Sequence, residues 1–363
     1  MTEAKTVLVT GASGLVGSET VARLRSRRVS AVALTHRKPD VVDSNGDGIE
    51  MEPFGPEAGG ASYVTGDVRR GDFGLDTDTI TALGGRVDLI VHCAATTDFA
   101  APEKDYSELN IGGTGHAAAL ARTWDVPLVY VSTAYVCGRR EGTIDENDLS
   151  DEHSFGNGYE RSKYIAEQMV RGDTDLRWAI VRPGIVTGCA DGGAIRDYKN
   201  LYTVVKLIVE GKLRTLPGRY DATLSLAPVD YVADAVVAAA TNFEAAQGKT
   251  IHAVGDAPLS LRDMSEVFAE YTSFHVARFV PAASFSVDSL DVIEREYYLR
   301  IGAQYANYFD GKRTFATTNA AELVGPPPET GKEYLRELLD YCLETDYLGA
   351  PLVSIEEVVK CSS

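Results

Sequence analysis

A glycine-rich segment near the N-terminus constrains the fold of this chain more than any other feature. The run Thr10-Gly11-Ala12-Ser13-Gly14-Leu15-Val16-Gly17 directly follows the apolar residues Val7-Leu8-Val9 and opens an amphipathic stretch over 15–27. This order, in which a glycine-rich turn joins a strand to a helix, is typical of the unit that binds the pyrophosphate of a dinucleotide. The glycines permit a tight turn, close approach of the backbone to the phosphates and close packing of the helix on the sheet. The helix then directs its N-terminal amides at the negative charge.

The rest of the first half alternates short apolar runs with amphipathic stretches. This alternation predicts the α/β class, with a doubly wound parallel sheet of the Rossmann type covered by helices on both faces. We expect strands over 6–10, 31–35, 62–64, 89–92, 128–132 and 178–181, and helices over 15–27, 103–124 and 159–171. Pro183 is expected to end the last of these strands.

Beyond residue 182 the pattern predicts a smaller domain that is interleaved with the first. We expect helices over 197–211 and 228–241, a strand over 250–254 that returns to the sheet, and a helix capped by Ser260. Residues 1–182 are therefore expected to form the dinucleotide-binding domain, with a return segment near 225–256. Residues 183–363 are expected to form mainly the substrate-binding domain.

The charge balance and the cysteines restrict the partners and the compartment. With 35 basic and 53 acidic residues, the net charge is −18, which disfavours binding to nucleic acid and to anionic lipid. No apolar run approaches the roughly 20 residues of a membrane span, and the N-terminus leaves no room for a signal peptide before the first strand. The five cysteines show no paired spacing, so we expect reduced thiols, no metal site and a cytoplasmic protein.

The ends of the predicted strands suggest how the adenosine part of a dinucleotide is held. The second strand ends at Leu34-Thr35-His36-Arg37-Lys38, without the acidic residue that grips the ribose of NAD. This favours NADP, with Arg37 on the 2′-phosphate. After the third strand, Asp67 can accept a hydrogen bond from the adenine amino group with Val68 beneath the ring; alternatively, Asp67 caps a helix.

The end of the fourth predicted strand and the helix after it are expected to lie near the nicotinamide. Ala94 and Ala95 are small enough to let a cofactor lie across the edge of the sheet, next to His92, which we expect to be a buried structural histidine. Asn110, on the following helix, is expected to tie that helix to the strand and to shape the nicotinamide pocket.

A tyrosine and a lysine provide candidate catalytic groups. Tyr159 and Lys163 are four positions apart, so they share one face of a predicted helix. A neighbouring ammonium group lowers the pKa of a phenol, and such a phenol can protonate or hydrogen-bond an oxygen that gains negative charge. Lys163 can also hold the ribose hydroxyls. Thr133, at the end of the fifth predicted strand, can donate a second hydrogen bond to the same oxygen.

Together these residues resemble the extended short-chain dehydrogenase/reductase superfamily over nearly the whole chain. The resemblance is closest to its thioester reductase branch, which includes fatty acyl-CoA reductases and the terminal reductase domains of carboxylic acid reductases and nonribosomal peptide synthetases. The matching segments are His92-Cys93-Ala94-Ala95-Thr96-Thr97-Asp98-Phe99, Val131-Ser132-Thr133-Ala134-Tyr135-Val136-Cys137-Gly138, Gly158-Tyr159-Glu160-Arg161-Ser162-Lys163, Val181-Arg182-Pro183-Gly184-Ile185-Val186-Thr187-Gly188 and Ala227-Pro228-Val229-Asp230-Tyr231-Val232.

The resemblance implies a role for each matching position. Thr133, Tyr159 and Lys163 would be the catalytic residues, and the backbone around Pro183–Val186 would hold the nicotinamide carboxamide. The residues implied to contact NADP are Gly11, Ser13, Gly14, Leu15, Val16, Gly17, Arg37, Asp67, Val68, Ala94, Ala95, Thr96, Asn110, Pro183 and Ile185. Members of this branch are usually fused to a carrier or adenylation domain, which this sequence does not contain. We therefore expect either that a carrier-bound substrate is recruited in trans or that the substrate is a different one.

The leading hypothesis is reduction of an acyl thioester, bound to a carrier protein or to coenzyme A, to the aldehyde, which a second hydride could convert to the alcohol. The alternatives are an NADP-dependent ketoreductase or hydroxy-dehydrogenase, a nucleotide-sugar epimerase or dehydratase, and a module that binds NADP without chemistry. The region 197–219 would face the acyl chain and its acyl or peptidyl carrier protein. Phe99, Tyr135, Tyr198 and Tyr202 are expected to make the substrate pocket partly aromatic. Five cations in it are candidate contacts for a phosphopantetheine or the carrier, or else form a solvated helix face: Lys199, Lys206, Lys212, Arg214 and Arg219.

Overall fold

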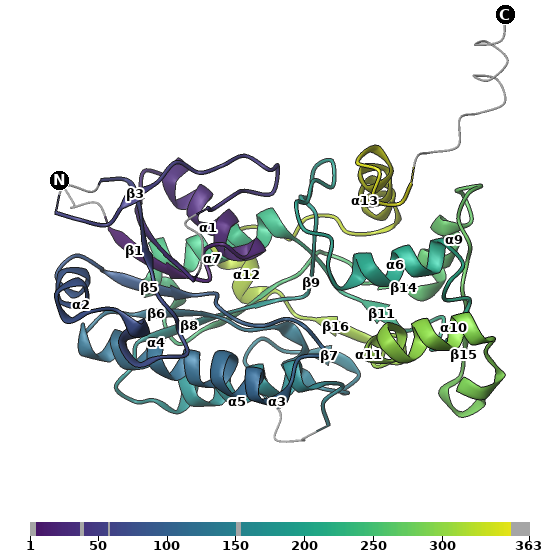
Figure 1. Ribbon diagram of the computed structural model, residues 1–363. Coiled ribbons are helices and arrows are strands. Elements are labelled where there is room, and N and C mark those ends of the chain that lie inside the picture. The colour runs from purple at the N-terminus through teal and green to yellow at the C-terminus, as the bar shows by residue number, and fades with distance from the viewer. Residues whose placement is uncertain (1–4, 37–39, 57–58, 150–153, 350–363) are drawn as a thin grey trace, which may run out of the picture.

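The computed structural model describes residues 5–36, 40–56, 59–149 and 154–349. Its centre is an eight-stranded sheet in the order β13-β8-β6-β5-β1-β2-β4-β3, in which every pair is parallel (Figure 1). The strands are β1 (Thr6–Thr10), β2 (Ser30–Thr35), β3 (Glu52–Pro53), β4 (Ala61–Thr65), β5 (Leu89–His92), β6 (Leu128–Val131), β8 (Trp178–Pro183) and β13 (Thr250–Ala253). The predicted doubly wound parallel sheet is thereby confirmed.

Helices cover both faces of this sheet because its strands are apolar on both sides. Val7 and Val9 of β1 point into the core shared with α1 (Leu15–Ser26) and α7 (Val229–Thr241), whereas Leu8 points into the opposite core. The opposite core is shared with α2 (Thr77–Gly84), α4 (Gly113–Thr123) and α5 (Gly158–Gly172). Strands that are apolar along their whole length are typical of a sheet that is covered on both faces.

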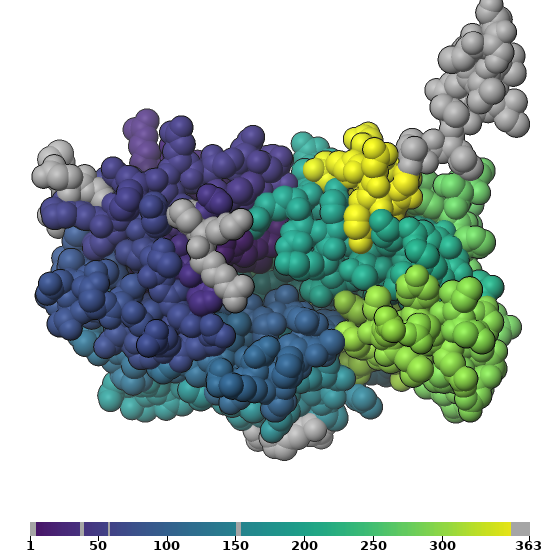
Figure 2. All heavy atoms as spheres, in the orientation of Figure 1, coloured from purple at the N-terminus to yellow at the C-terminus, as the bar shows by residue number. Residues whose placement is uncertain are grey.

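A second hydrophobic core lies beyond the carboxyl ends of the strands. The segments that form it gather on the right of Figures 1 and 2, mostly in teal, green and yellow. This core is built around α6 (Leu201–Val209), α9 (Leu261–Phe268) and α13 (Lys332–Glu344), with the helical stretch α10 (Val292–Tyr297), η6 (Tyr298–Gly302) and α11 (Ala303–Tyr305). Short strand pairs frame it: β9 (Ile185–Thr187) with β12 (Leu226–Pro228), β10 (Thr215–Pro217) with β15 (Arg278–Val280), β11 (Thr223–Leu224) with β14 (Leu259–Ser260), and β16 (Arg313–Phe315) with β7 (Gly142–Ile144).

The chain crosses between the two cores more than once. After β12 it returns to the sheet as α7 and then as β13, which pairs with β8, as predicted from the apolar run over 250–254. It later sends α12 (Thr318–Leu323) back to the same core. Ser260 caps α9, as predicted, because its hydroxyl accepts a hydrogen bond from the Asp263 amide at 3.0 Å.

The strand β8 ends at Pro183, as predicted, although it runs beyond the expected range 178–181. The proline is tolerated at this position because β6 ends at the Val131–Val181 pair and the missing N–H of the proline faces no strand there. Two predicted helices are wrong in part, each for a local reason. The helix predicted from 197 starts only at Leu201, because Asn200 has a φ of 51°. The helix predicted over 103–124 contains a π-helical turn, Tyr106–Gly112, between α3 (Glu103–Asp105) and α4.

In the part of the chain that the structure describes, no helix combines the length and apolarity needed to cross a bilayer. The same part contains no group of three or more His, Cys, Asp or Glu side chains placed to hold a metal ion.

Candidate active site

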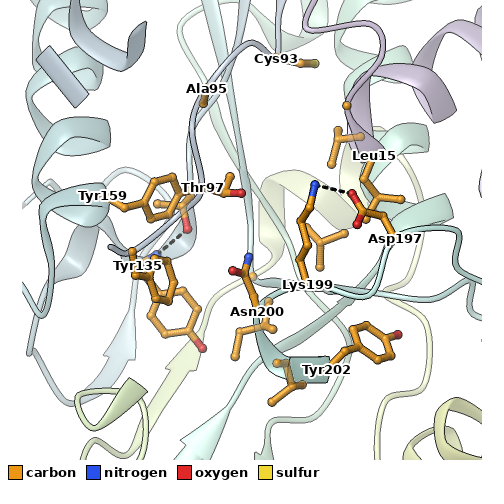
Figure 3. A pocket seen from close by; sticks show the side chains of 18 of the residues that line it. Leu15, Cys93, Ala95, Thr97, Tyr135, Tyr159, Asp197, Lys199, Asn200 and Tyr202 are labelled. Atoms are coloured by element: carbon orange, nitrogen blue, oxygen red, sulfur yellow. Dashed lines mark hydrogen bonds and ion pairs between the residues drawn. The ribbon is translucent and has the colours of Figure 1, made fainter. Parts of the chain in front are cut away.

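A cavity of about 310 Å³ lies between the carboxyl edge of the sheet and the second core (Figure 3). Residues from both parts of the chain line it. They include Gly11, Ser13, Gly14, Leu15, Val16, Gly17, Cys93, Ala95, Thr97, Phe99, Thr133, Tyr135, Tyr159, Gly184, Ile185, Val186, Asp197, Lys199, Asn200, Leu201, Tyr202, Leu224, Tyr305, Tyr308 and Phe309. The ends of parallel strands at a topological switch point are where open α/β sheets bind their ligands.

The glycine-rich loop forms one side of this cavity. Gly11 has a φ of 65°, and a Cβ there would lie 2.6 Å from the Ala94 amide nitrogen, so only glycine fits. A Cβ on Gly17 would overlap the Gly11 carbonyl. Gly14 begins α1 without any side-chain cap, which leaves the first amides of the helix open to an anion. The loop therefore fits the pyrophosphate of a dinucleotide.

Of the other residues predicted to contact the dinucleotide, some line the cavity and others do not. Ala95 and Ile185 line it, whereas Ala94, Thr96 and Pro183 are adjacent to lining residues in the chain. Asp67 does not cap a helix; its carboxylate accepts hydrogen bonds from the Arg69 side chain, which lower its pKa to about 2. Val68 packs near Gly113. Arg37 lies outside the described residues.

Asn110 is a buried tie between three elements. Its side chain accepts a hydrogen bond from the Thr96 amide at 2.8 Å, donates to the Thr96 carbonyl at 3.1 Å and donates to the Ser162 hydroxyl at 2.8 Å. It lies on the π-helical turn, a distortion that often marks functional positions. Asn110 therefore holds the segment after β5 against the helix that carries Tyr159 and Lys163.

His92 is buried at the end of β5, as predicted. Its Nδ1 lies 2.8 Å from the Thr10 hydroxyl, and burial lowers its pKa to about 3. The ring is therefore neutral at physiological pH, which agrees with a structural role.

Thr133 and Tyr159 meet at the cavity. Tyr159 lies in the first turn of α5, whose N-cap, Asn157, accepts a hydrogen bond from the Glu160 amide at 2.9 Å. Thr133 follows β6 and begins a short 3₁₀ turn, η3 (Ala134–Cys137). The Thr133 hydroxyl, which donates to the Pro183 carbonyl at 3.4 Å and accepts from the Tyr135 amide at 3.3 Å, lies near the Tyr159 phenol, and both residues line the cavity. Two hydroxyl groups thus lie where they can approach one substrate oxygen.

Lys163 lies behind this pair. Its ammonium group donates to the Val131 carbonyl at 2.7 Å and lies 4.2 Å from the centre of the Tyr130 ring. Burial lowers its pKa to about 7, partly offset by Cys93 and Glu167. The expected lowering of the Tyr159 pKa by Lys163 is wrong for this structure: burial raises that pKa, and the nearby Thr133 hydroxyl only offsets part of the rise. The phenol is therefore protonated at neutral pH and acts as a donor.

The aromatic part of the cavity is only half predicted from the sequence. Of the four residues expected there, Phe99, Tyr135 and Tyr202 line the cavity. Tyr198 does not line it and stacks on Tyr347 instead, with 4.1 Å between the ring centres. Tyr305, Tyr308 and Phe309 line the cavity without having been predicted. Three aromatic residues within five positions, on an otherwise polar stretch, are the signal that could have indicated them. Asn200, at a φ of 51°, also lines the cavity, and residues in such sparsely populated conformations cluster at ligand sites.

The five cations between 199 and 219 do not form an open basic surface. Each has a partner in this acidic chain, and only Lys199 lines the cavity. The partners are Asp197 for Lys199 (2.5 Å), the Tyr347 carbonyl for Lys206 (2.6 Å), Glu210 for Lys212 (2.6 Å), Asp291 and Glu294 for Arg214, and Glu141 and Asp221 for Arg219.

Curated proteins that are similar in sequence to this chain include reductases that are much longer. The glycine betaine reductase ATRR of Emericella nidulans is 29% identical over 287 residues, which cover 73% of this chain and 22% of that protein. The chain spans only about a fifth of the length of such curated relatives.

Two solved structures are similar over almost the whole chain. The terminal R domain from the myxalamid PKS-NRPS biosynthetic pathway has a TM-score of 0.80 and 25% identity, over 97% of this chain and 94% of that one. A thiolation-reductase di-domain from an archaeal non-ribosomal peptide synthetase has a TM-score of 0.68 and 18% identity, over 95% and 76%. Epimerases of UDP-sugars share the fold at under 20% identity.

The family model described as Male sterility protein matches residues 9–236, from β1 through most of α7. This span contains the glycine-rich loop, Thr133, Tyr159 and Lys163. The chain thus belongs to the Male sterility protein family and is an oxidoreductase of the extended short-chain dehydrogenase/reductase type, in its thioester reductase branch, with a site for a nicotinamide dinucleotide.

Proposed function

We propose that this protein uses NADPH to reduce an acyl thioester to the aldehyde. The observation that carries the proposal is the shared cavity, in which the glycine-rich loop and the Thr133–Tyr159 pair face the same space. The likeness to the myxalamid R domain over 97% of the chain supports a thioester rather than another carbonyl compound.

The roles of the side chains follow from their protonation states. A bound reduced nicotinamide supplies a hydride, the two electrons that the thioester carbonyl carbon accepts. Thr133 and Tyr159 donate hydrogen bonds to the carbonyl oxygen as it becomes negative, and the phenol can do so because it is protonated at neutral pH. The carbon–sulfur bond then breaks, the oxygen forms the aldehyde carbonyl, and the thiolate leaves and takes a proton.

Lys163 is proposed to hold the nicotinamide ribose hydroxyls. Its ammonium group is already fixed by the Val131 carbonyl, at the end of the strand that leads to Thr133. It therefore positions a bound dinucleotide relative to the two hydroxyl groups without moving a proton itself.

The proposed donors are carrier-protein or coenzyme A thioesters. The thiolation-reductase di-domain among the similar structures supports a carrier-bound substrate. An NADP-dependent ketoreductase is the second candidate, because the same pair of hydroxyl groups serves a free carbonyl.

The test is NADPH oxidation with acyl-pantetheine and acyl-CoA thioesters beside the matching free aldehydes and ketones, with released thiol titrated in parallel. We expect thioester-dependent oxidation with one thiol released for each aldehyde formed. Oxidation with free ketones alone would replace the proposal by a ketoreductase. If the purified protein retained NAD tightly and none of these compounds caused net NADPH oxidation, an epimerase or dehydratase would be favoured.

A further inference from the structure

One wall of the cavity beside Tyr159 is aromatic. The Phe99 ring lies 5.7 Å from the Tyr159 ring, 5.2 Å from Tyr305 and 5.6 Å from Tyr308, measured between ring centres. Tyr135 lies 4.7 Å from Tyr308. The side chains that flank the proposed reacting oxygen on this side are thus flat and largely apolar.

This aromatic wall, formed by Phe99, Tyr135, Tyr305 and Tyr308, is held in place by ring contacts and by a hydrogen bond. The Tyr308 ring is packed between Phe99 and Tyr135, and its hydroxyl lies near the buried carboxyl group of Glu160. The Tyr135 hydroxyl accepts a hydrogen bond from the Ser225 amide at 3.3 Å. These ring contacts and the Tyr135 hydrogen bond hold the rings in place, so they form a preorganised surface for an acyl group.

The charges along the cavity cancel. Among the lining residues that the structure describes, the charged ones are Asp197 and Lys199, and their side chains pair at 2.5 Å. A charged acyl group would lose its hydration here without gaining a counter-ion, and such burial is costly. An uncharged acyl group gains by covering the aromatic wall.

We propose that the acyl group of the substrate is uncharged and apolar, and that it packs against the aromatic wall. This inference rests on the proposed function, because it names the class of thioester that the same cavity takes. It excludes acyl groups with a free carboxylate or ammonium group near the reacting carbon.

The first experiment compares kcat/KM for three N-acetylcysteamine thioesters of similar length: hexanoyl, glutaryl and 5-aminopentanoyl. We expect the hexanoyl thioester to be favoured at least tenfold over both charged ones. A glutaryl or 5-aminopentanoyl thioester within threefold of hexanoyl would overturn the inference and leave the thioester reductase function intact.

A binding measurement separates failure of the inference from failure of the proposed function. The unreactive hexanamide, glutaramate and 5-aminopentanamide are titrated into the protein–NADP⁺ complex by calorimetry. At least tenfold tighter binding of hexanamide would support the apolar acyl site even if no thioester were reduced. Equal affinities, or no binding of any of the three, would overturn it.

A pair of variants locates the site. Tyr305→Ala removes one ring of the wall, whereas Tyr297→Ala removes a ring of the same helical stretch that contacts Lys212 and does not line the cavity. We expect Tyr305→Ala to raise KM for the hexanoyl thioester about fivefold with an unchanged NADPH Kd, and Tyr297→Ala to change neither. Equal effects of the two variants would contradict the placement.

Discussion

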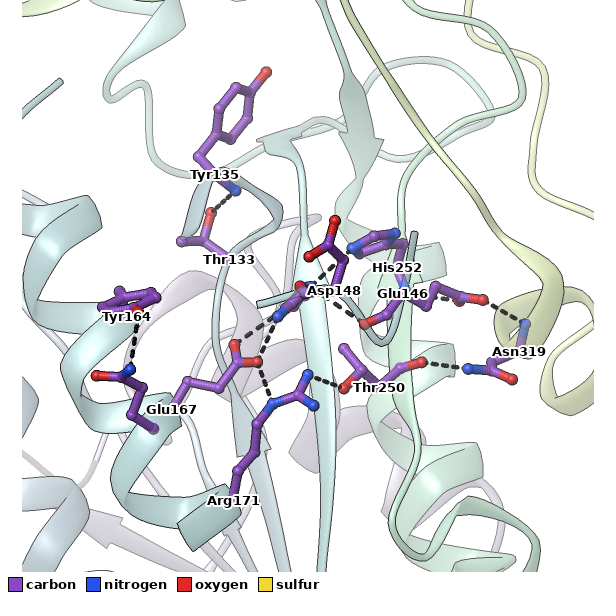
Figure 4. A network of polar contacts seen from close by, with 12 residues as sticks. Thr133, Tyr135, Glu146, Asp148, Tyr164, Glu167, Arg171, Thr250, His252 and Asn319 are labelled. Atoms are coloured by element: carbon purple, nitrogen blue, oxygen red, sulfur yellow. Dashed lines mark hydrogen bonds and ion pairs between the residues drawn. The ribbon is translucent and has the colours of Figure 1, made fainter. Parts of the chain in front are cut away.

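The Glu167 carboxylate, labelled in Figure 4, and the Arg182 guanidinium form an ion pair of 2.6 Å in which both side chains are fully buried. Glu167 lies one helical turn after Lys163 on α5, and Arg182 lies on β8. The same carboxylate also accepts a hydrogen bond from Arg171 at 2.8 Å, and Arg171 donates to the Thr250 hydroxyl on β13. The helix that carries Tyr159 and Lys163 is therefore joined to two strands of the sheet through charged groups.

Glu167→Gln is expected to destabilise the protein strongly. It leaves the buried Arg182 charge without its counter-ion, and breaking such a pair costs about 3–5 kcal/mol. Urea unfolding measures the loss. Glu103→Gln is the matched control. Glu103 pairs at 3.0 Å with Arg161, which lies on α5 like Glu167, but both side chains of this pair are more than half exposed. Exposed pairs contribute about 1 kcal/mol or less. Equal losses for both variants would contradict the role of burial.

Tyr159→Phe is expected to lower kcat about 100-fold or more, because it removes a donor from the oxygen that becomes negative. Thr133→Val should lower kcat less, since Tyr159 still donates. The NADPH Kd, measured by fluorescence titration, should stay within about threefold of the wild-type value for both. Wild-type kcat in Tyr159→Phe would remove this residue from the proposed mechanism.

The buried ammonium group of Lys163 gives a pH-dependent stability. Burial lowers its pKa to about 7, below the ordinary value of 10.5 that it regains on unfolding. The unfolded chain therefore binds more protons between these values, so stability rises with pH across that interval. Lys163→Met lacks this titration. In urea unfolding, the free energy of unfolding of the wild type should therefore rise relative to that of Lys163→Met from pH 7 to pH 10. A difference between the two proteins that does not change with pH would contradict the lowered pKa.

The sequence predicts the parts of the site that depend on local backbone chemistry. Gly11 and Gly17 are needed because a Cβ would collide with neighbouring backbone, and Tyr159 and Lys163 share a helix face through their spacing. What it does not predict depends on three-dimensional packing. The ring of Tyr305 reaches the cavity from a region more than 140 residues away from Tyr159, and the Lys163 ammonium group turns to the Val131 carbonyl instead of the phenol.

Cofactor preference is expected to depend on the end of β2. No acidic residue follows Leu34 and Thr35 there, and Arg69 brings its guanidinium to 3.5 Å from His36 at this end. Arg37→Ala should lower kcat/KM for NADPH about tenfold or more and leave the value for NADH nearly unchanged, because only NADPH carries the 2′-phosphate. Steady-state kinetics with both cofactors measure the ratio. Parallel losses with NADPH and NADH would contradict the assignment.

Arg196 ties the second core to the glycine-rich loop. Its guanidinium donates to the Ser13 carbonyl at 2.9 Å and to the Ser18 hydroxyl at 3.1 Å, while Leu15 of the loop packs near Ile195 and Tyr202. Loss of hydrogen bonds from a charged group costs about 1.5–3 kcal/mol. If they hold the loop in its binding conformation, Arg196→Gln should raise the NADPH Kd about tenfold. Arg27→Gln, at the far end of α1 and paired with Asp234, should leave it unchanged; equal affinities in both variants would show that the loop needs no support from the second core.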